Sequence, residues 1–154
     1  MAYEIKGWRG INDNRPLATQ VALLNYGQTP AHRAKICGTI RIMPFPLPPG
    51  YKLPELKEEF PQSFDVFPSQ SSNPPVGWIT AEKAFTADEI AEITSETSIR
   101  HVYMLGRITY LDVFDKPRET IFRSFLDPKS IERNSAGQIT TFVWAVAEGG
   151  NDFL

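Results

Sequence analysis

Nine of the chain's 13 prolines lie between Pro44 and Pro75, and this cluster constrains the fold more than any other feature. Proline lacks a backbone N–H and has a fixed φ, so such a segment neither continues a helix nor pairs in the middle of a sheet. We therefore predict a long proline-rich insert at 44–75, with one or two helical turns expected at 54–60. An insert of this length in a compact domain is either functional or packed against the fold by its own aromatic side chains.

The residues before the insert alternate with the period of a β-strand. Between His32 and Ile42, one face is largely apolar and the opposite face is largely polar, which predicts a strand with one buried side. A shorter, half-alternating strand is expected at 19–24. Cys37 lies in the longer run and is interpreted as a small buried hydrophobic residue, with a nucleophilic or redox role as the alternative.

After the insert, Thr86 and Glu89 have the spacing of a capping box, which predicts a short helix that begins at Thr86. The residues that follow are rich in β-branched and aromatic side chains, which favour strands. The first of these strands is apolar on both faces, as in the centre of a sheet, and Gly106 in its middle indicates a bulge or the close approach of another backbone. The predicted strands are 101–114, 119–126 and 139–147.

About seven or eight strands, one helix and no alternation of strands with helices predict a mainly β fold. We expect an antiparallel β-sandwich, immunoglobulin-like in the broad sense, with one short helix and the long proline-rich loop; a small barrel is the alternative. A chain of 154 residues fits a single domain, 1–154, because it is too short for two comfortable cores. Residues 148–154 are expected to be a frayed tail.

The segment N-Y-G-Q-T-P-A, residues 25–31, predicts a turn between two strands. Asn25 is suited to turn its side-chain amide onto the backbone two residues on, and Gly27 is expected to have a positive φ. Pro30 is expected at the entrance of the next strand, where its missing donor does no harm. We interpret the segment as a corner of the sheet; the alternative is a loop that cradles a ligand.

Two segments together resemble a group of uncharacterised bacterial proteins, which are usually fused to an N-terminal transmembrane anchor. The first is N-x-G-x-T-P-A, and the second is a short helix followed by G-x-I-x-Y-x-D-x-F-G-x-x-R-x-T-x-F-C. The resemblance implies a membrane-tethered or membrane-derived sandwich domain, such as the soluble domain of a bacterial inner-membrane protein, and it implies no reaction. The matching residues are Asn25, Gly27, Thr29, Pro30, Gly106, Ile108, Tyr110, Asp112, Phe114, Arg118, Thr120 and Phe122.

The chain departs from this pattern at two positions. Asp115 stands where the group usually has glycine, so a different hairpin turn is expected. Arg123 stands where the group often has cysteine, and Cys37 is the only cysteine of the chain, which leaves no internal cystine.

The sequence is poor in groups that carry out chemistry. A net charge of −2 gives no electrostatic footprint for nucleic acid. His32 and His101 are far apart in the sequence and form no zinc-binding pair, and there is no glycine-rich phosphate loop. The carboxylates of Asp112, Asp115 and Glu119 are expected to form ion pairs around a hairpin, with a metal or general-acid pair as the alternative. Arg107, Tyr110 and Asp112 are expected to form a buried hydrogen-bonded network that is structural.

These observations predict a binding or interaction module that is not an enzyme and has no cofactor. Its expected partner is a protein, not nucleic acid, and a membrane enters only through an anchor outside this chain. The candidate interaction surface is Phe45, Leu47 and Tyr51, because a proline-rich segment loses little freedom on binding. The alternative function is a small-ligand sensor or regulatory domain with a cleft under the proline-rich loop.

Overall fold

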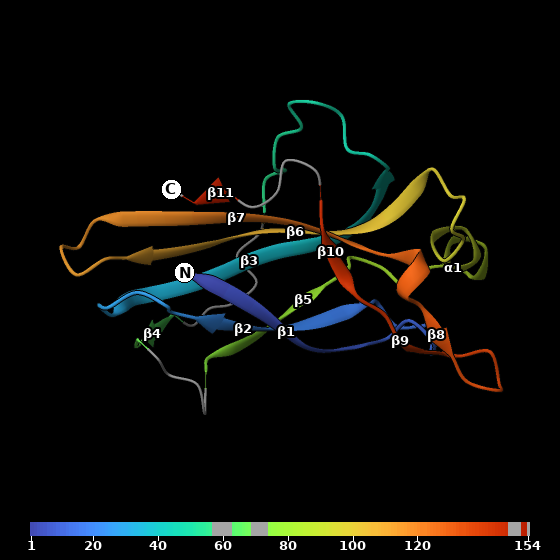
Figure 1. The fold of residues 1–154 in the computed structure, drawn as a ribbon, viewed down its shortest axis with the longest axis horizontal. Coiled ribbons are helices and arrows are strands. Elements are labelled where there is room, and N and C mark those ends of the chain that lie inside the picture. Colours follow the sequence, from blue (N-terminus) through green and yellow to red (C-terminus); the bar gives the residue numbers. More distant parts are fainter. Residues whose placement is uncertain (57–62, 69–73, 148–151, 154) are drawn as a thin grey trace.

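The computed structural model describes residues 1–56, 63–68, 74–147 and 152–153. Two antiparallel sheets lie one above the other in two layers (Figure 1). The smaller sheet has the strand order β1-β2-β5. Its strands are β1 (Ala2–Arg9), β2 (Ala18–Leu24) and β5 (Val76–Thr80).

The larger sheet has the strand order β10-β7-β6-β3-β4, and β11 also pairs with β7. The expected central position of the strand around Gly106 is confirmed, because β6 pairs with β3 on one side and with β7 on the other. The strands are β3 (Ala31–Pro44), β4 (Phe64–Val66), β6 (Arg100–Leu111), β7 (Pro117–Leu126), β10 (Trp144–Val146) and β11 (Asp152–Phe153).

A small hairpin and two helical segments complete the described chain. Thr86 caps the α-helix as expected: its hydroxyl accepts from the Glu89 amide, and the Glu89 carboxylate accepts from the Thr86 amide. For the described residues, a mainly β fold with antiparallel sheets and one α-helix is confirmed. The remaining elements are α1 (Ala87–Ile93), the 3-10 helix η1 (Pro128–Ser130), β8 (Glu132–Arg133) and β9 (Ile139–Thr141).

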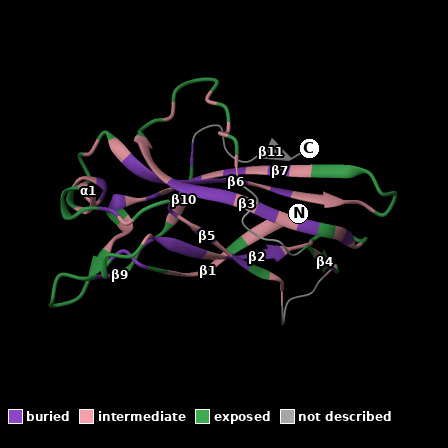
Figure 2. Cartoon of the chain, turned by 180° about the vertical axis from the view of Figure 1, so that it is seen from behind, coloured by how far each residue is buried: buried purple, intermediate pink, exposed green. Residues whose placement is uncertain are grey.

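The main core lies between the two sheets. Alternate side chains of a strand point to opposite faces, and the inward-facing set of the larger sheet meets β2 and β5 of the smaller one (Figure 2). Tyr3 from β1 packs on Phe122 from β7 with ring centroids 4.8 Å apart. Side chains with at most 2% exposure in this core include Leu17, Val21, Ile79, Ile40, Met104, Ile108, Phe122 and Leu126.

The outer face of the larger sheet is also covered. Tyr103 and Leu105 of β6 are buried on that face, and the half-buried side chains of Leu47, Tyr51 and Leu53 pack against them. Two covered faces explain why β6 carries apolar side chains on both of its faces. The described start of the proline-rich insert is therefore packed against the fold, as one of the two alternatives predicted.

Gly106 marks a close approach, as predicted, and not a bulge. A Cβ atom at Gly106 would clash with the carbonyl oxygen of Cys37 and with the ring of Phe122. The register across β3 and β6 runs without a break through the pair Gly38 and Gly106. The absence of a side chain at Gly106 therefore makes room for the Phe122 ring.

Several boundaries differ from the predictions. The strand predicted at 139–147 is two strands, β9 and β10, and Phe142, which lies between them, packs on Trp8. Cys37 is half-buried on the outer face, not buried. Residues 152–153, expected as part of a frayed tail, pair with β7. The other residues of 148–154 lie outside the described residues. Residues 54–56 are not helical, and the rest of the helical turn predicted at 54–60 lies outside the described residues.

No helix within the described residues is long and apolar enough to span a bilayer.

Candidate functional site

Three connections meet at one end of the two layers, on the left in Figure 1: the β2–β3 loop, the end of β4 and the β6–β7 turn. We call this region the loop end. A groove of about 240 Å³ lies here. Residues of both motif segments line it together, although they are far apart in the sequence. The lining residues are Met1, Asn25, Gly27, Thr29, Pro30, Ala31, Tyr110, Asp112 and Arg118.

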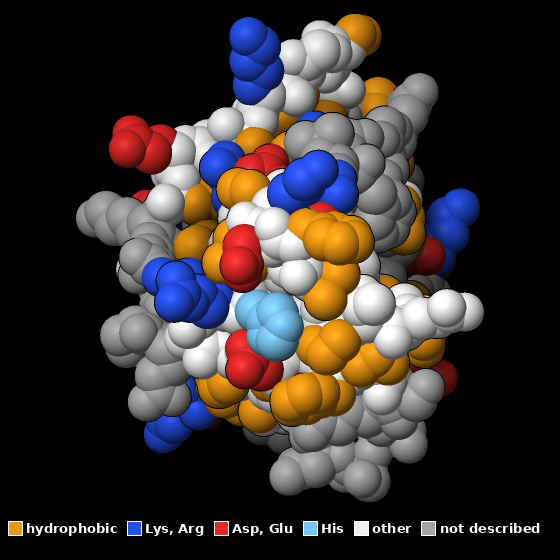
Figure 3. All heavy atoms as spheres, turned by 90° about the vertical axis from the view of Figure 1, so that its left-hand side faces the viewer, with side chains coloured by type: hydrophobic (Ala, Val, Ile, Leu, Met, Phe, Trp, Pro, Cys, Tyr) orange, Lys and Arg blue, Asp and Glu red, His pale blue; other side chains and the backbone are white. Residues whose placement is uncertain are grey.

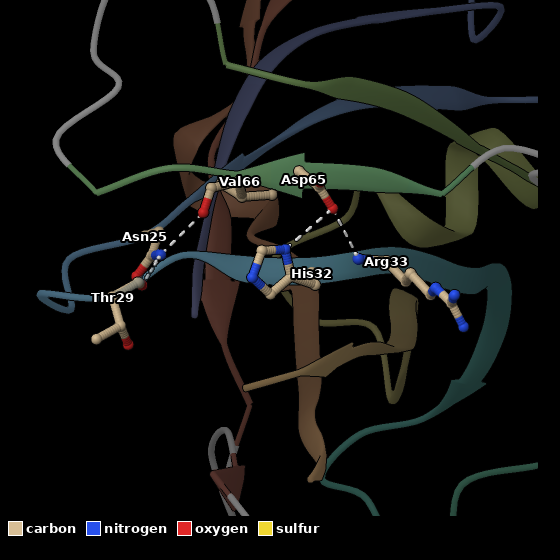
Figure 4. A network of polar contacts seen from close by, with 6 residues as sticks. All are labelled: Asn25, Thr29, His32, Arg33, Asp65 and Val66. Atoms are coloured by element: carbon tan, nitrogen blue, oxygen red, sulfur yellow. Dashed lines mark hydrogen bonds and ion pairs between the residues drawn. The ribbon is translucent and has the colours of Figure 1, made fainter. Parts of the chain in front are cut away.

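Asn25 holds the β2–β3 loop through three hydrogen bonds, and Figure 4 shows those to Thr29 and Val66. Its side-chain amide donates to the carbonyl oxygens of Thr29 at 2.8 Å and of Val66 at 2.9 Å. Its Oδ1 accepts from the backbone N–H of Gly27 at 2.9 Å, which confirms the predicted contact two residues on. The loop is therefore fastened both to itself and to β4.

The positive φ expected at Gly27 is wrong. The described glycines with a positive φ are Gly10, Gly50 and Gly137, and Gly27 is not among them. The hydrogen bond from Gly27 to Asn25 closes the turn by itself, so no left-handed residue is needed there. Pro30 directly precedes β3, at the strand entrance as predicted.

A bulge follows at the start of β3. The register with β6 shifts between His32 and Lys35, and Arg33 has a φ of 50°. This conformation is unfavourable for a side chain larger than glycine. Oδ1 of Asp65 on β4 accepts from the Arg33 amide at 3.1 Å and lies 3.5 Å from Nδ1 of His32 (Figure 4). Asp65 therefore stabilises the bulge from the neighbouring strand.

Asp112 organises the β6–β7 turn. Its Oδ1 accepts from the amides of Phe114 at 2.9 Å and Lys116 at 3.0 Å, and its Oδ2 lies 2.8 Å from Nη2 of Arg118. These bonds lower the pKa of the Asp112 carboxyl, and the hydrogen bond from the Lys116 amide has the largest effect. Asp115 has a φ of 58°, the conformation that a glycine at this position would supply most easily.

The predicted network of Arg107, Tyr110 and Asp112 is replaced by separate contacts. Arg107 Nη1 lies 3.9 Å from the carboxylate of Glu119, and its Nε is buried without a hydrogen bond within the described chain. The reason is the period of the strand: Arg107 is on the outer face of β6, and Tyr110 and Asp112 belong to the opposite set.

Of the three carboxylates expected to form ion pairs around the hairpin, Asp112 pairs with Arg118 and Glu119 with Arg107, whereas Asp115 has no ion pair among the described residues. Across the residues that the structure describes, no group of three or more His, Cys, Asp or Glu has the arrangement of a metal site.

Large hydrophobic side chains are exposed around the loop end. Figure 3 views this end, where hydrophobic side chains lie among charged ones. Of nine exposed large hydrophobic residues in the described chain, four belong to its turns and to the end of β4. This surface was not predicted from the sequence, although an aromatic residue in the middle of a tight turn, such as Tyr26, was a usable signal. The four are Tyr26 (80% exposed), Phe114 (77%), Phe67 (51%) and Val113 (48%).

The predicted surface of Phe45, Leu47 and Tyr51 lies elsewhere, on the outer face of the larger sheet. Phe45 is 40% exposed, and the other two are half-buried. None of the three lines the loop-end groove. Because none is fully buried, a role in binding stays a prediction for them.

Beneath Phe45 is an aromatic cluster. The ring centroid of Phe45 lies 4.2 Å from that of His101, in an edge-on arrangement, and 5.0 Å from that of Phe125. Burial lowers the pKa of His101, and the charge of Asp127 opposes this shift. Nδ1 of His101 is buried and has no hydrogen-bond partner within the described chain. Burial also raises the pKa of Tyr103 to about 12.

Comparison with protein-family models, with curated proteins and with solved structures finds no match for this chain. The resemblance of the two motif segments stays an expectation, and the function is inferred from the chain's own geometry.

Proposed function

We propose that the chain is a non-enzymatic, immunoglobulin-like β-sandwich module that binds a protein partner through its loop end. One observation carries the proposal: exposed aromatic side chains stand on turns whose backbones are held by side-chain hydrogen bonds. Tyr26 stands on the turn held by Asn25, and Phe114 on the turn held by Asp112.

Exposed aromatic rings on ordered turns favour binding for two reasons. A ring that leaves water on contact contributes about 25 cal/mol for each Å² of apolar surface that is covered. A turn that is already fixed loses little conformational entropy in the complex. Aromatic residues are also the side chains that most often carry the binding energy of protein interfaces.

The loop end fits this role better than the surface around Phe45. Leu47 and Tyr51 already cover Tyr103 and Leu105, so exposing them to a partner would uncover a second core. Tyr26 and Phe114 cover little of the fold, since each is more than three-quarters exposed. The resemblance adds the context of a membrane-anchored bacterial protein, in which such a module would display its loops to a neighbour.

The experiment compares two double variants, each of which removes two exposed hydrophobic side chains. Tyr26→Ser with Phe114→Ser removes the loop-end rings, and Ile99→Ser with Val143→Ser removes exposed side chains elsewhere. The immobilised proteins are incubated with an extract of the organism that encodes the chain, and bound proteins are quantified. We expect one partner to be retained by the wild type and the control variant but lost by the loop-end variant. Equal retention by both variants would contradict the proposal.

A further inference from the structure

A second groove is lined in part by α1, which lies away from the loop end, on the right of Figure 1. It runs between the last part of β3 and the segment that connects β5 to α1. Its volume of about 630 Å³ is in the range of small-molecule sites. The lining residues are Ile40, Arg41, Ile42, Ala81, Glu82, Lys83, Phe85, Glu89 and Arg100.

The floor of this groove is apolar and belongs to the main core. Ile40, Ala81 and Phe85 are buried, with exposures of 2%, 4% and 7%, and Ile42 packs against the same cluster. A floor made of core side chains is held in position by the fold. It offers a compact apolar ligand a surface that does not need to be ordered on binding.

The rim carries three cations and two carboxylates, and both carboxylates already have partners. Glu82 lies 3.4 Å from Nη2 of Arg41. Glu89 accepts from the Thr86 amide, and this bond is the main cause of its lowered pKa; the charges of Lys83 and Arg100 lower that pKa further. Within the described chain, the other two cations of the rim make no direct ion pair with a carboxylate that lines the groove.

These cations are Lys83 and Arg100. Lys83 makes no ion pair within the described part of the chain. Arg100 lies 3.5 Å from Glu92, a carboxylate that does not line the groove, and both side chains are partly exposed. An ion pair of this kind in solvent contributes little and is readily exchanged for another anion.

We propose that this groove binds a small organic anion, namely a carboxylate attached to a compact apolar body. The carboxylate lies between Lys83 and Arg100, and the apolar body lies on Phe85 and Ile42. Two cations compensate the charge, and the buried floor removes the apolar part from water. This site is independent of the loop end and of the protein partner proposed for it.

The test uses octanoate as the probe and 1-octanol as its uncharged counterpart. Backbone amide signals of the labelled protein are followed by NMR during titration to about 10 mM, which covers affinities as weak as about 1 mM. We expect octanoate to shift the signals of residues 81–85 and of Arg100 saturably. Octanol should bind at least about tenfold more weakly than octanoate. Added salt should weaken the binding of octanoate, because salt screens the charges of exposed cations.

Two variants of the rim and one matched control complete the experiment. Lys83→Gln with Arg100→Gln should weaken octanoate binding at least about tenfold, a loss of about 1.4 kcal/mol. Lys83→Glu tests the same cation at an exposed position where folding is not at risk. Lys52→Gln with Lys129→Gln removes two exposed lysines elsewhere and should bind like the wild type. The proposal is overturned if octanoate causes no saturable shift, or if the rim variants bind it as tightly as the control.

Discussion

The side-chain amide of Asn25 donates to the backbone carbonyl of Val66 at 2.9 Å, across 41 positions of sequence. This bond joins the β2–β3 loop to the last residue of β4, the edge strand of the larger sheet. The same side chain closes its own turn on Gly27. One residue therefore sets the shape of the turn and its place on the sheet, and Tyr26 is displayed from that turn.

Replacing Asn25 by alanine removes all three of these hydrogen bonds. We expect the free energy of unfolding to fall by about 1–2 kcal/mol, because part of the contact with Val66 is screened from water. Thr29→Ala is the matched control, since only the backbone carbonyl of Thr29 takes part. Urea unfolding measures both variants. Equal stabilities of the two would show that Asn25 does not fasten the loop.

Gly106 and Gly27 are expected to respond differently to alanine. A Cβ at Gly106 clashes with the Cys37 carbonyl and the Phe122 ring, whereas one at Gly27 meets only Oδ1 of Asn25 at 3.1 Å. Gly106→Ala should therefore destabilise the fold by about 1–3 kcal/mol. Gly27→Ala should change stability by less than about 1 kcal/mol. Thermal unfolding separates the two, and a larger loss from Gly27→Ala would reverse our account of the corner.

His101 makes stability depend on pH. Burial lowers its pKa in the folded protein, so the unfolded chain binds the proton more readily. The free energy of unfolding is therefore unaffected by His101 well above the unfolded pKa of about 6.5, and it decreases as the pH falls below that value. We expect the wild type to lose more unfolding free energy between about pH 7.5 and 5 than His101→Gln does. Parallel pH profiles of the two proteins would exclude His101 as the cause.

The features that local sequence determines were predicted well. The capping box of Thr86 and Glu89 spans three positions, and the alternation around Ile36 and Ile40 follows from the strand period alone. Both depend on neighbours in the chain, which one sequence shows directly.

Long-range contacts were predicted poorly. The contact of Asn25 with Val66 and the covering of Leu105 by Leu53 depend on which distant segments the fold brings together. The assignment of Arg107 is a different kind of error. Because alternate residues of a strand point to opposite faces, Arg107 and Tyr110 lie on opposite faces of β6. The strand period alone was therefore sufficient to exclude a contact of Arg107 with Tyr110 and Asp112.

The central claim is that a protein partner contacts the loop end, and site-specific photocrosslinking in the native cells tests it most directly. Benzoylphenylalanine replaces Phe114 in one protein and Ile99 in another, two side chains that are each 77% exposed. We predict one defined adduct from position 114 upon irradiation and none from position 99. The same adducts from both positions, or none from position 114, would contradict the account.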